Sequence, residues 1–179
     1  MMYETIVNQP AISGADFDLR PLRLSDRGLI EMYTNDARVA KNTASIPHPL
    51  PPGSTDGFIK RALSKDRTED VWAMDASKSG GSEIMGLIGL TRMDRNQSEV
   101  GYWVAPAFWN TGVASLALGM LIGANPQECS GLFASVFQDN PASARVLTKS
   151  GFEYLGDAEV FSVARNANVA TWTYLKKLD

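Results

Sequence analysis

The stretch from Glu99 to Ala117 constrains the fold of this chain more than any other, and it reads EVGYWVAPAFWNTGVASLA. An alternating strand ends at Val104, a proline-containing turn follows, and small residues from Gly112 onward open an apolar helix. Small residues at a helix N-terminus leave the unpaired backbone N–H groups open to a ligand, and the helix dipole favours an anion there. Taken alone, such a turn is more often only a tight connection between a strand and a helix.

Two well-known phosphate-binding motifs are absent from the sequence. No lysine follows Gly112, as a nucleotide-hydrolysing P-loop requires, and no GxGxxG dinucleotide-binding motif occurs. The single cysteine, Cys129, and the single histidine, His48, leave no multi-cysteine zinc site and little scope for histidine chemistry. We therefore expect no metal centre, with Cys129 a small buried hydrophobe and His48 a loop residue. The chemistry then has to come from backbone groups, carboxylates and hydroxyls.

Composition predicts one soluble domain with a core of its own, because 44% of the 179 residues are hydrophobic and 21% are charged. The net charge of −3 argues against bulk electrostatic binding of nucleic acid. Residues 1–16 have no signal-peptide pattern, and the longest apolar run, 113–124, is too short to span a bilayer. We expect a cytoplasmic protein that binds neither nucleic acid nor membranes, with an N-terminal extension over 1–16 and a single domain over 17–179.

The order of apolar patterns predicts a mixed α/β domain. Strands are expected over 17–23, 71–75, 84–91, 99–104, 132–137, 154–161 and 169–175, and helices over 26–35, from 54, from 112 and over 141–150. The segment Ile46–Gly53 contains four prolines, so we expect a stiff surface loop that either shapes a substrate entrance or only connects two helices. The order βααβββαβαββ places about seven strands and about four helices around one central sheet.

A second informative block runs from Phe137 to Gly156 and reads FQDNPASARVLTKSGFEYLG. Asn140 is placed to cap a helix that begins at Pro141, and Gly151 is placed to end it. Ser143 then lies in the first turn of this helix. A serine at such a position commonly hydrogen-bonds to the nearby backbone, and this is one interpretation of Ser143.

Together these segments resemble the GNAT superfamily of acyl-CoA N-acyltransferases, and most closely its branch of ribosomal-protein N-terminal alanine acetyltransferases. The resemblance covers about residues 17–179 and is carried by EVGYWVAPAFWNTGVASLA, by NPASARVLTKSGF and by the closing strand pair that ends in TWTYLKKL. It implies a central mixed, mostly antiparallel sheet and acetyl-CoA as co-substrate. It also implies that the backbone at Val104 pairs with the pantetheine arm and that Asn140 contacts CoA. The CoA pyrophosphate would lie on the turn formed by Asn110, Thr111, Gly112, Val113, Ala114 and Ser115.

Four positions depart from the family pattern. Many members have Arg or Gln where Trp109 stands, Gly where Ala114 stands, and, in this branch, Glu where Leu116 stands. The tyrosine that is the general acid in much of the superfamily corresponds to Leu147, and the branch implies Ser143 in that role. These departures support an alternative function, a non-catalytic CoA-binding module with the same fold.

The resemblance also implies that Glu99 is the catalytic glutamate beside the thioester. An α-amine is roughly a tenth neutral at pH 7 and a lysine amine far less, so a weak base acting through water serves an α-amine more easily. The alternative is that Glu99 is a solvated carboxylate at the end of a strand. We expect transfer of an acetyl group from acetyl-CoA to a primary amine, of a small molecule or a protein N-terminus, by direct attack in a ternary complex. Because relatives dimerise, a homodimer is a candidate state.

Overall fold

The central sheet has eight strands in the computed structural model, which describes residues 9–178. They are β1 (Ile12–Ser13), β2 (Asp18–Pro21), β3 (Glu69–Asp75), β4 (Gly86–Met93), β5 (Gln97–Val104), β6 (Gly131–Phe137), β7 (Glu153–Ser162) and β8 (Ala167–Lys177). Their order across the sheet is β1-β2-β3-β4-β5-β6-β8-β7. Every neighbouring pair is antiparallel except β5 and β6, which run parallel. The mixed, mostly antiparallel sheet is therefore as the sequence predicted.

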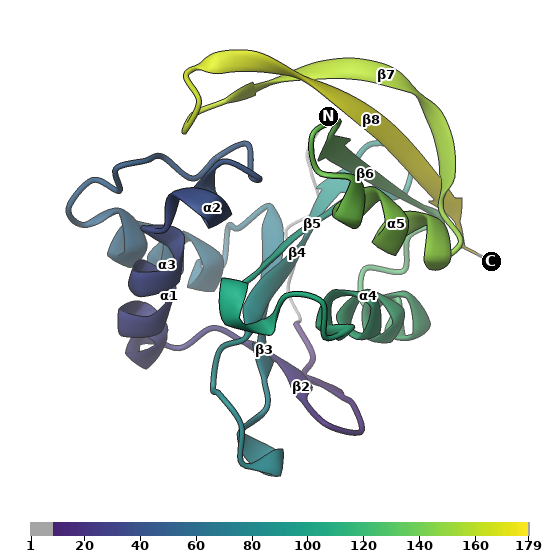
Figure 1. Cartoon of the computed structure of the whole chain (residues 1–179). Coiled ribbons are helices and arrows are strands. Elements are labelled where there is room, and N and C mark those ends of the chain that lie inside the picture. Colours follow the sequence, from purple (N-terminus) through teal and green to yellow (C-terminus); the bar gives the residue numbers. More distant parts are fainter. Residues whose placement is uncertain (1–8, 179) are drawn as a thin grey trace.

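Helices cover both faces of this sheet (Figure 1). One face carries α1 (Arg27–Thr34), α2 (Ala37–Ala40) and α3 (Ser54–Leu63), and the other carries α4 (Val113–Ala124) and α5 (Pro141–Lys149). Ile30 of α1 and Ile59 of α3 are buried in one cluster with Val71 and Leu87 of the sheet. The apolar helix α4 buries Leu118 in the larger cluster on the opposite face. Within residues 9–178, no helix has both the length and the apolar content needed to cross a bilayer.

The structure adds one strand and one helix to the expected seven and four. The short strand β1 lies inside the segment expected to be an N-terminal extension, where Ile12 pairs with Leu19. The single-turn helix α2 is capped by Asp36, whose carboxylate accepts from the Arg38 N–H at 2.9 Å. Neither element is long enough to show a hydrophobic period, which is why the pattern did not predict it. The proline-rich segment 46–53 is a loop, as expected.

The parallel pair of β5 and β6 is short, and this shortness creates the site. Only residues 97–99 pair with residues 131–133, so the two strands have no mutual backbone ladder beyond Glu99. At the end of β5, the Ala105 N–H donates to the Met85 carbonyl at the β4 side. Because backbone groups alternate in direction along a strand, those of Val104 face the gap toward β6.

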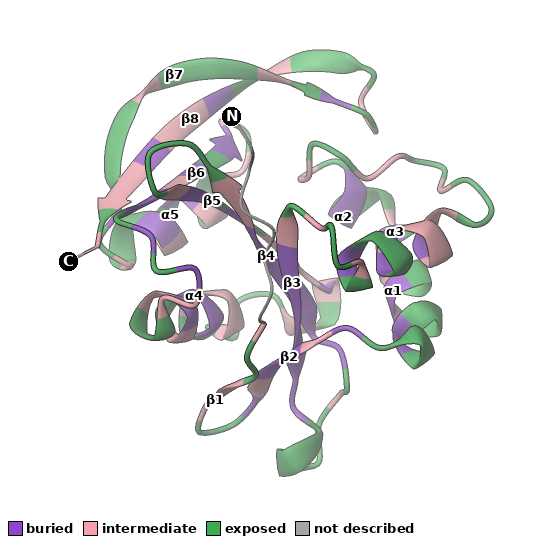
Figure 2. Cartoon of the chain, turned by 180° about the vertical axis from the view of Figure 1, so that it is seen from behind, coloured by how far each residue is buried: buried purple, intermediate pink, exposed green. Residues whose placement is uncertain are grey.

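The hairpin of β7 and β8 arches over one end of the sheet (Figure 1), and most of β7 is exposed whereas β3 and β4 are mostly buried (Figure 2). Its tip reaches the chain that follows α2. There the Val163 N–H donates to the Ala44 carbonyl at 3.0 Å, and Arg165 Nε donates to the Lys41 carbonyl at 2.9 Å. The hairpin therefore bridges two parts of the fold that lie far apart in the sequence.

Candidate active site

Two cavities meet at the gap between β5 and β6. One has a volume of about 510 Å³ and lies between the sheet and the helices α4 and α5. The other has a volume of about 660 Å³ and lies on the face covered by α1 and α3. Residues 100–103 of β5, with Ser135 and Phe137 of β6, line both cavities. A ligand in one cavity can therefore reach a ligand in the other through the sheet.

Among residues 9–178, the charged residues that line the first cavity are all basic, namely Arg38, Arg145 and Lys149, and we call it the basic cavity. It also contains the N-terminus of α4. Gly112 caps that helix in the left-handed conformation (φ 82°) and offers no side-chain hydrogen bond. The first bond inside the helix runs from the Leu116 N–H to the Gly112 carbonyl, so the N–H groups of 113–115 have no partner within the helix. Charge and geometry both suit an anion.

Most residues that the resemblance assigned to the co-substrate line this basic cavity: Val104, Asn110, Gly112, Val113, Ala114, Ser115 and Asn140. Thr111 does not line it, and its hydroxyl donates instead to the Phe108 carbonyl. The capping predicted for α5 is confirmed, because Asn140 Oδ1 accepts from the Ser143 N–H at 3.4 Å and Gly151 follows the helix at φ 91°.

Trp109, one of the departures from the family pattern, ties the turn to the end of β5. Its indole Nε1 donates to the Val104 carbonyl at 2.7 Å. The Arg38 guanidinium lies over the indole ring, 5.9 Å from its centre, and is paired with Asp36 at 2.7 Å. The bulky ring therefore fixes the cavity wall and leaves the Val104 N–H directed at the gap.

A tyrosine–serine pair lies where the two cavities join. The Tyr102 hydroxyl and Ser143 Oγ are 2.9 Å apart, and Tyr102 lines both cavities while Ser143 lines the basic one. Burial raises the pKa of the Tyr102 phenol, so this group keeps its proton at neutral pH. The sequence patterns assign no catalytic role to Tyr102. Its partner is 41 positions away, and no local pattern signals the contact.

Glu99 lies on the opposite face of β5 from Tyr102, because side chains alternate along a strand. It lines the second cavity, which we call the acidic cavity because Glu69 and Glu99 line it with Arg61 as the one cation among its described lining residues. Solvent reaches Glu99 through the cavity, yet the surrounding protein removes part of its hydration and raises the pKa of the carboxyl. A raised pKa suits a general base better than the ordinary value does.

The remaining sequence candidates lie outside both cavities, as expected. Cys129 is buried, and its thiol contacts Asn125 Oδ1 at 3.4 Å. His48 belongs to the proline-rich loop and lines neither cavity. Neither residue is placed for nucleophilic chemistry.

Residues 16–153 match the acetyltransferase (GNAT) domain family, which is most of the chain. The chain belongs to the GNAT acetyltransferase family. The uncharacterized N-acetyltransferase YoaA of Bacillus subtilis (strain 168) is 30% identical over 99 residues, which are 53% of this chain and 55% of YoaA. The match thus spans about half the length of that relative. The family predicted from the sequence is confirmed.

Solved structures share the GNAT fold over nearly their whole length. The ribosomal-protein-S5-alanine acetyltransferase of Vibrio fischeri matches with a TM-score of 0.77 and 20% identity, covering 96% of this chain and 98% of that one. The spermidine N-acetyltransferase of Vibrio cholerae, solved with CoA and spermine, matches with a TM-score of 0.73 and 16% identity, covering 89% and 95%. At such identities the likeness shows the fold alone. The expected GNAT fold class is therefore confirmed.

Proposed function

We propose that this GNAT domain transfers an acetyl group from acetyl-CoA to a primary amine, with the co-substrate in the basic cavity and the amine in the acidic cavity. The observation that carries the proposal is the meeting of two oppositely charged cavities at the gap between β5 and β6. A proton acceptor, Glu99, lies on one side of that gap. A pair of hydroxyl donors, Tyr102 and Ser143, lies on the other.

The basic cavity offers complementary groups along the length of a CoA molecule. The N–H groups of 113–115 and the side chains of Arg145 and Lys149 would bind phosphate oxygens. The Val104 N–H would bind the pantetheine arm or the thioester oxygen as charge develops there. Acetyl-CoA itself supplies the activated carbonyl carbon that the amine attacks.

Two proton transfers accompany this attack, one on each side of the gap. Glu99 accepts a proton from the amine, directly or through one water. Ser143 donates a proton to the departing thiolate, and Tyr102 donates its own proton to Ser143 across the 2.9 Å contact. Exchange with solvent afterwards returns a proton to Tyr102 and removes one from Glu99. The amine nitrogen gains the acetyl group as the carbon–sulfur bond breaks.

The second candidate, a non-catalytic CoA-binding module, is favoured by one observation. Leu147, at the position of the family's general-acid tyrosine, is fully buried and has no acidic proton. The Tyr102–Ser143 pair supplies an alternative donor, and this is why we prefer the enzyme. The homodimer expected from the resemblance stays a prediction.

The substitution Glu99→Gln separates the two functions. An enzyme loses about 10²–10⁴-fold in turnover when its general base is removed, while acetyl-CoA binding by calorimetry stays unchanged. Glu83→Gln is the matched control, because Glu83 is exposed and lines neither cavity. A wild-type protein that binds acetyl-CoA but acetylates no member of a broad amine panel would be the binding module instead.

A further inference from the structure

Three polar residues lie in one row across the floor of the acidic cavity. In the register of the sheet, Glu69 of β3 lies opposite Thr91 of β4, and Thr91 lies opposite Glu99 of β5. All three line the cavity. Glu69 Oε2 accepts from Thr91 Oγ1 at 3.0 Å, so its carboxylate is held toward the middle of the row. The proposed reaction uses Glu99 alone and leaves Glu69 without a role.

Two glycines keep the floor between the carboxylates open. Gly89 of β4 and Gly101 of β5 lie opposite each other in the sheet, beside this row, and both line the cavity. A Cβ at Gly89 would lie 3.2 Å from the Glu69 carboxylate, whereas a Cβ at Gly101 would meet no atom of residues 9–178 within 4 Å. The missing side chain at Gly89 therefore lets Glu69 lean across β4. The space over Gly101 can take a slim ligand.

The charges in this cavity are unbalanced. Neither Glu69 nor Glu99 forms an ion pair within residues 9–178. Burial raises the pKa of the Glu69 carboxyl. The hydrogen bond from Thr91 opposes this rise, and the nearby charge of Glu99 adds to it. Arg61, the one cation among the described lining residues, is exposed on α3 and forms no ion pair with either carboxylate. A cationic ligand would offset the loss of hydration by forming ion pairs with both carboxylates.

An unused hydroxyl points to a ligand in the same cavity. Thr171 lines it, is 1% exposed, and its Oγ1 has no hydrogen-bond partner within the described part of the chain. Buried polar groups are nearly always paired, so an orphan hydroxyl beside a cavity fits a bound partner. The aromatic rings of Phe58 and Trp103 line the walls. There they can contact the methylenes of a ligand, and a ring face can also bind an ammonium group.

We propose that the acceptor is an aliphatic amine with a second cationic group, of which diamines are the simplest members. This inference rests on the proposed function, because it places the reacting amine at Glu99. Glu69 binds the second ammonium group, and the methylenes between the two lie over Gly101. Glu69 is therefore an acceptor-binding residue that sets specificity. A protein N-terminus carries only one ammonium group at its reacting end and would leave Glu69 unpaired.

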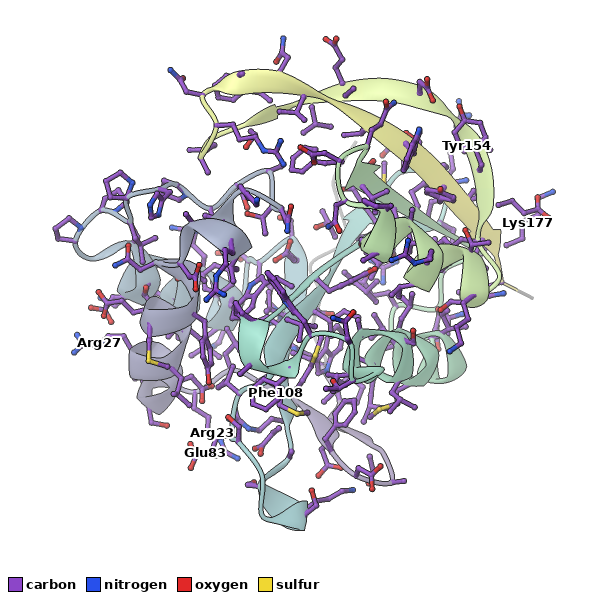
Figure 3. All side chains as sticks on the ribbon, in the orientation of Figure 1. Arg23, Arg27, Glu83, Phe108, Tyr154 and Lys177 are labelled. Carbon is purple, nitrogen blue, oxygen red and sulfur yellow. The ribbon has the colours of Figure 1, made fainter. Side chains whose placement is uncertain are left out.

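The test compares acceptors that differ in one charge. Acetylation is measured with diaminobutane, butylamine or an alanine-ended peptide amide as the acceptor. Each acceptor is tested with the wild-type protein, with Glu69→Gln and with Glu83→Gln. Glu83, which is exposed and lines neither cavity, lies in the lower part of the view in Figure 3. The wild type should prefer diaminobutane by about tenfold or more in kcat/KM, since a hydrogen bond to a charged group has that effect. Glu69→Gln should abolish the preference, because diaminobutane then loses much more of its kcat/KM than butylamine does, and Glu83→Gln should preserve it.

Several results would overturn the inference while leaving the enzyme intact. These are equal use of diaminobutane and butylamine by the wild type, a clear preference for the peptide, or an equal loss for all acceptors in Glu69→Gln. If Glu69→Gln does not fold, calorimetry on the wild type loaded with CoA replaces it, and diaminobutane must bind at least about tenfold more tightly than butylamine. Failure of the proposed function looks different, because no amine would then be acetylated, whether or not acetyl-CoA binds.

Discussion

The contact between Tyr102 and Ser143 makes the sharpest mechanistic prediction. At 2.9 Å the two hydroxyls form one hydrogen-bonded unit, so removing either interrupts the same proton path. Loss of a general acid slows a reaction by about 10²–10⁴-fold, or about 2.7–5.4 kcal/mol in activation free energy. We expect Tyr102→Phe and Ser143→Ala each to fall within this range.

The double variant distinguishes a unit from two independent donors. Independent effects would multiply to about 10⁴–10⁸-fold, whereas residues that act as a unit are strongly non-additive. We expect the double variant to be no slower than the slower single variant. The coupling free energy would then nearly equal the effect of one substitution.

The assay is release of the CoA thiol at saturating acetyl-CoA, with each variant first checked for acetyl-CoA binding and for its unfolding temperature. Tyr33→Phe is the control, since Tyr33 packs edge-on against Trp103 at 6.3 Å and lines neither cavity. It should retain full turnover. Single variants within twofold of the wild type, or a double variant that is the product of the singles, would refute the shared proton path.

Three further predictions follow from the same geometry. Glu99 acts only when it is ionised, and burial raises its pKa, so kcat/KM should rise with pH above the ordinary glutamate range. Glu99→Gln should remove this rise. A rise that persists in the variant would belong to another group. A carboxyl with a raised pKa contributes stability at low pH that is lost as pH rises through that pKa, so Glu69→Gln should raise the unfolding temperature more at neutral than at acidic pH; an equal shift at both would contradict this. Gly112→Ala, at a φ of 82°, should lower the free energy of unfolding by about 1–2 kcal/mol, measured by denaturant unfolding. Gly119→Ala, inside α4, should raise it by about 0.5–1 kcal/mol in the same assay. The opposite order would contradict a start of α4 at a left-handed Gly112.

Local signals allowed the sequence to predict the elements that bind the co-substrate in our proposal. Gly112 at the start of α4, with Asn140 and Gly151 at the two ends of α5, are capping residues whose effect depends only on nearby backbone. The match of residues 16–153 to the GNAT family then confirmed the fold class and the acetyltransferase domain. The roles of individual residues remain predictions.

The parts that the sequence did not reveal depend on strand register. Glu69 and Glu99 come into one row only because β3, β4 and β5 pair as they do. Tyr102 meets Ser143 only because β5 and β6 are parallel and carry α5 beside the gap. Likewise, the sequence shows Trp109 only as a departure from the family pattern, whereas the structure shows that its indole donates to the Val104 carbonyl and forms part of the cavity wall. A periodic pattern gives the faces of a strand but not its neighbours.

The most direct test of the central proposal is thermal unfolding of the wild-type protein with and without acetyl-CoA, with ATP and NAD as controls. A ligand at about 100 times its Kd stabilises the folded state by about 2.7 kcal/mol, which is roughly 5–10 °C for a domain of this size. We predict a shift of that order with acetyl-CoA and a much smaller one with either control. No shift at saturating acetyl-CoA, or an equal shift with ATP, would contradict the assignment of the basic cavity to an acyl-CoA.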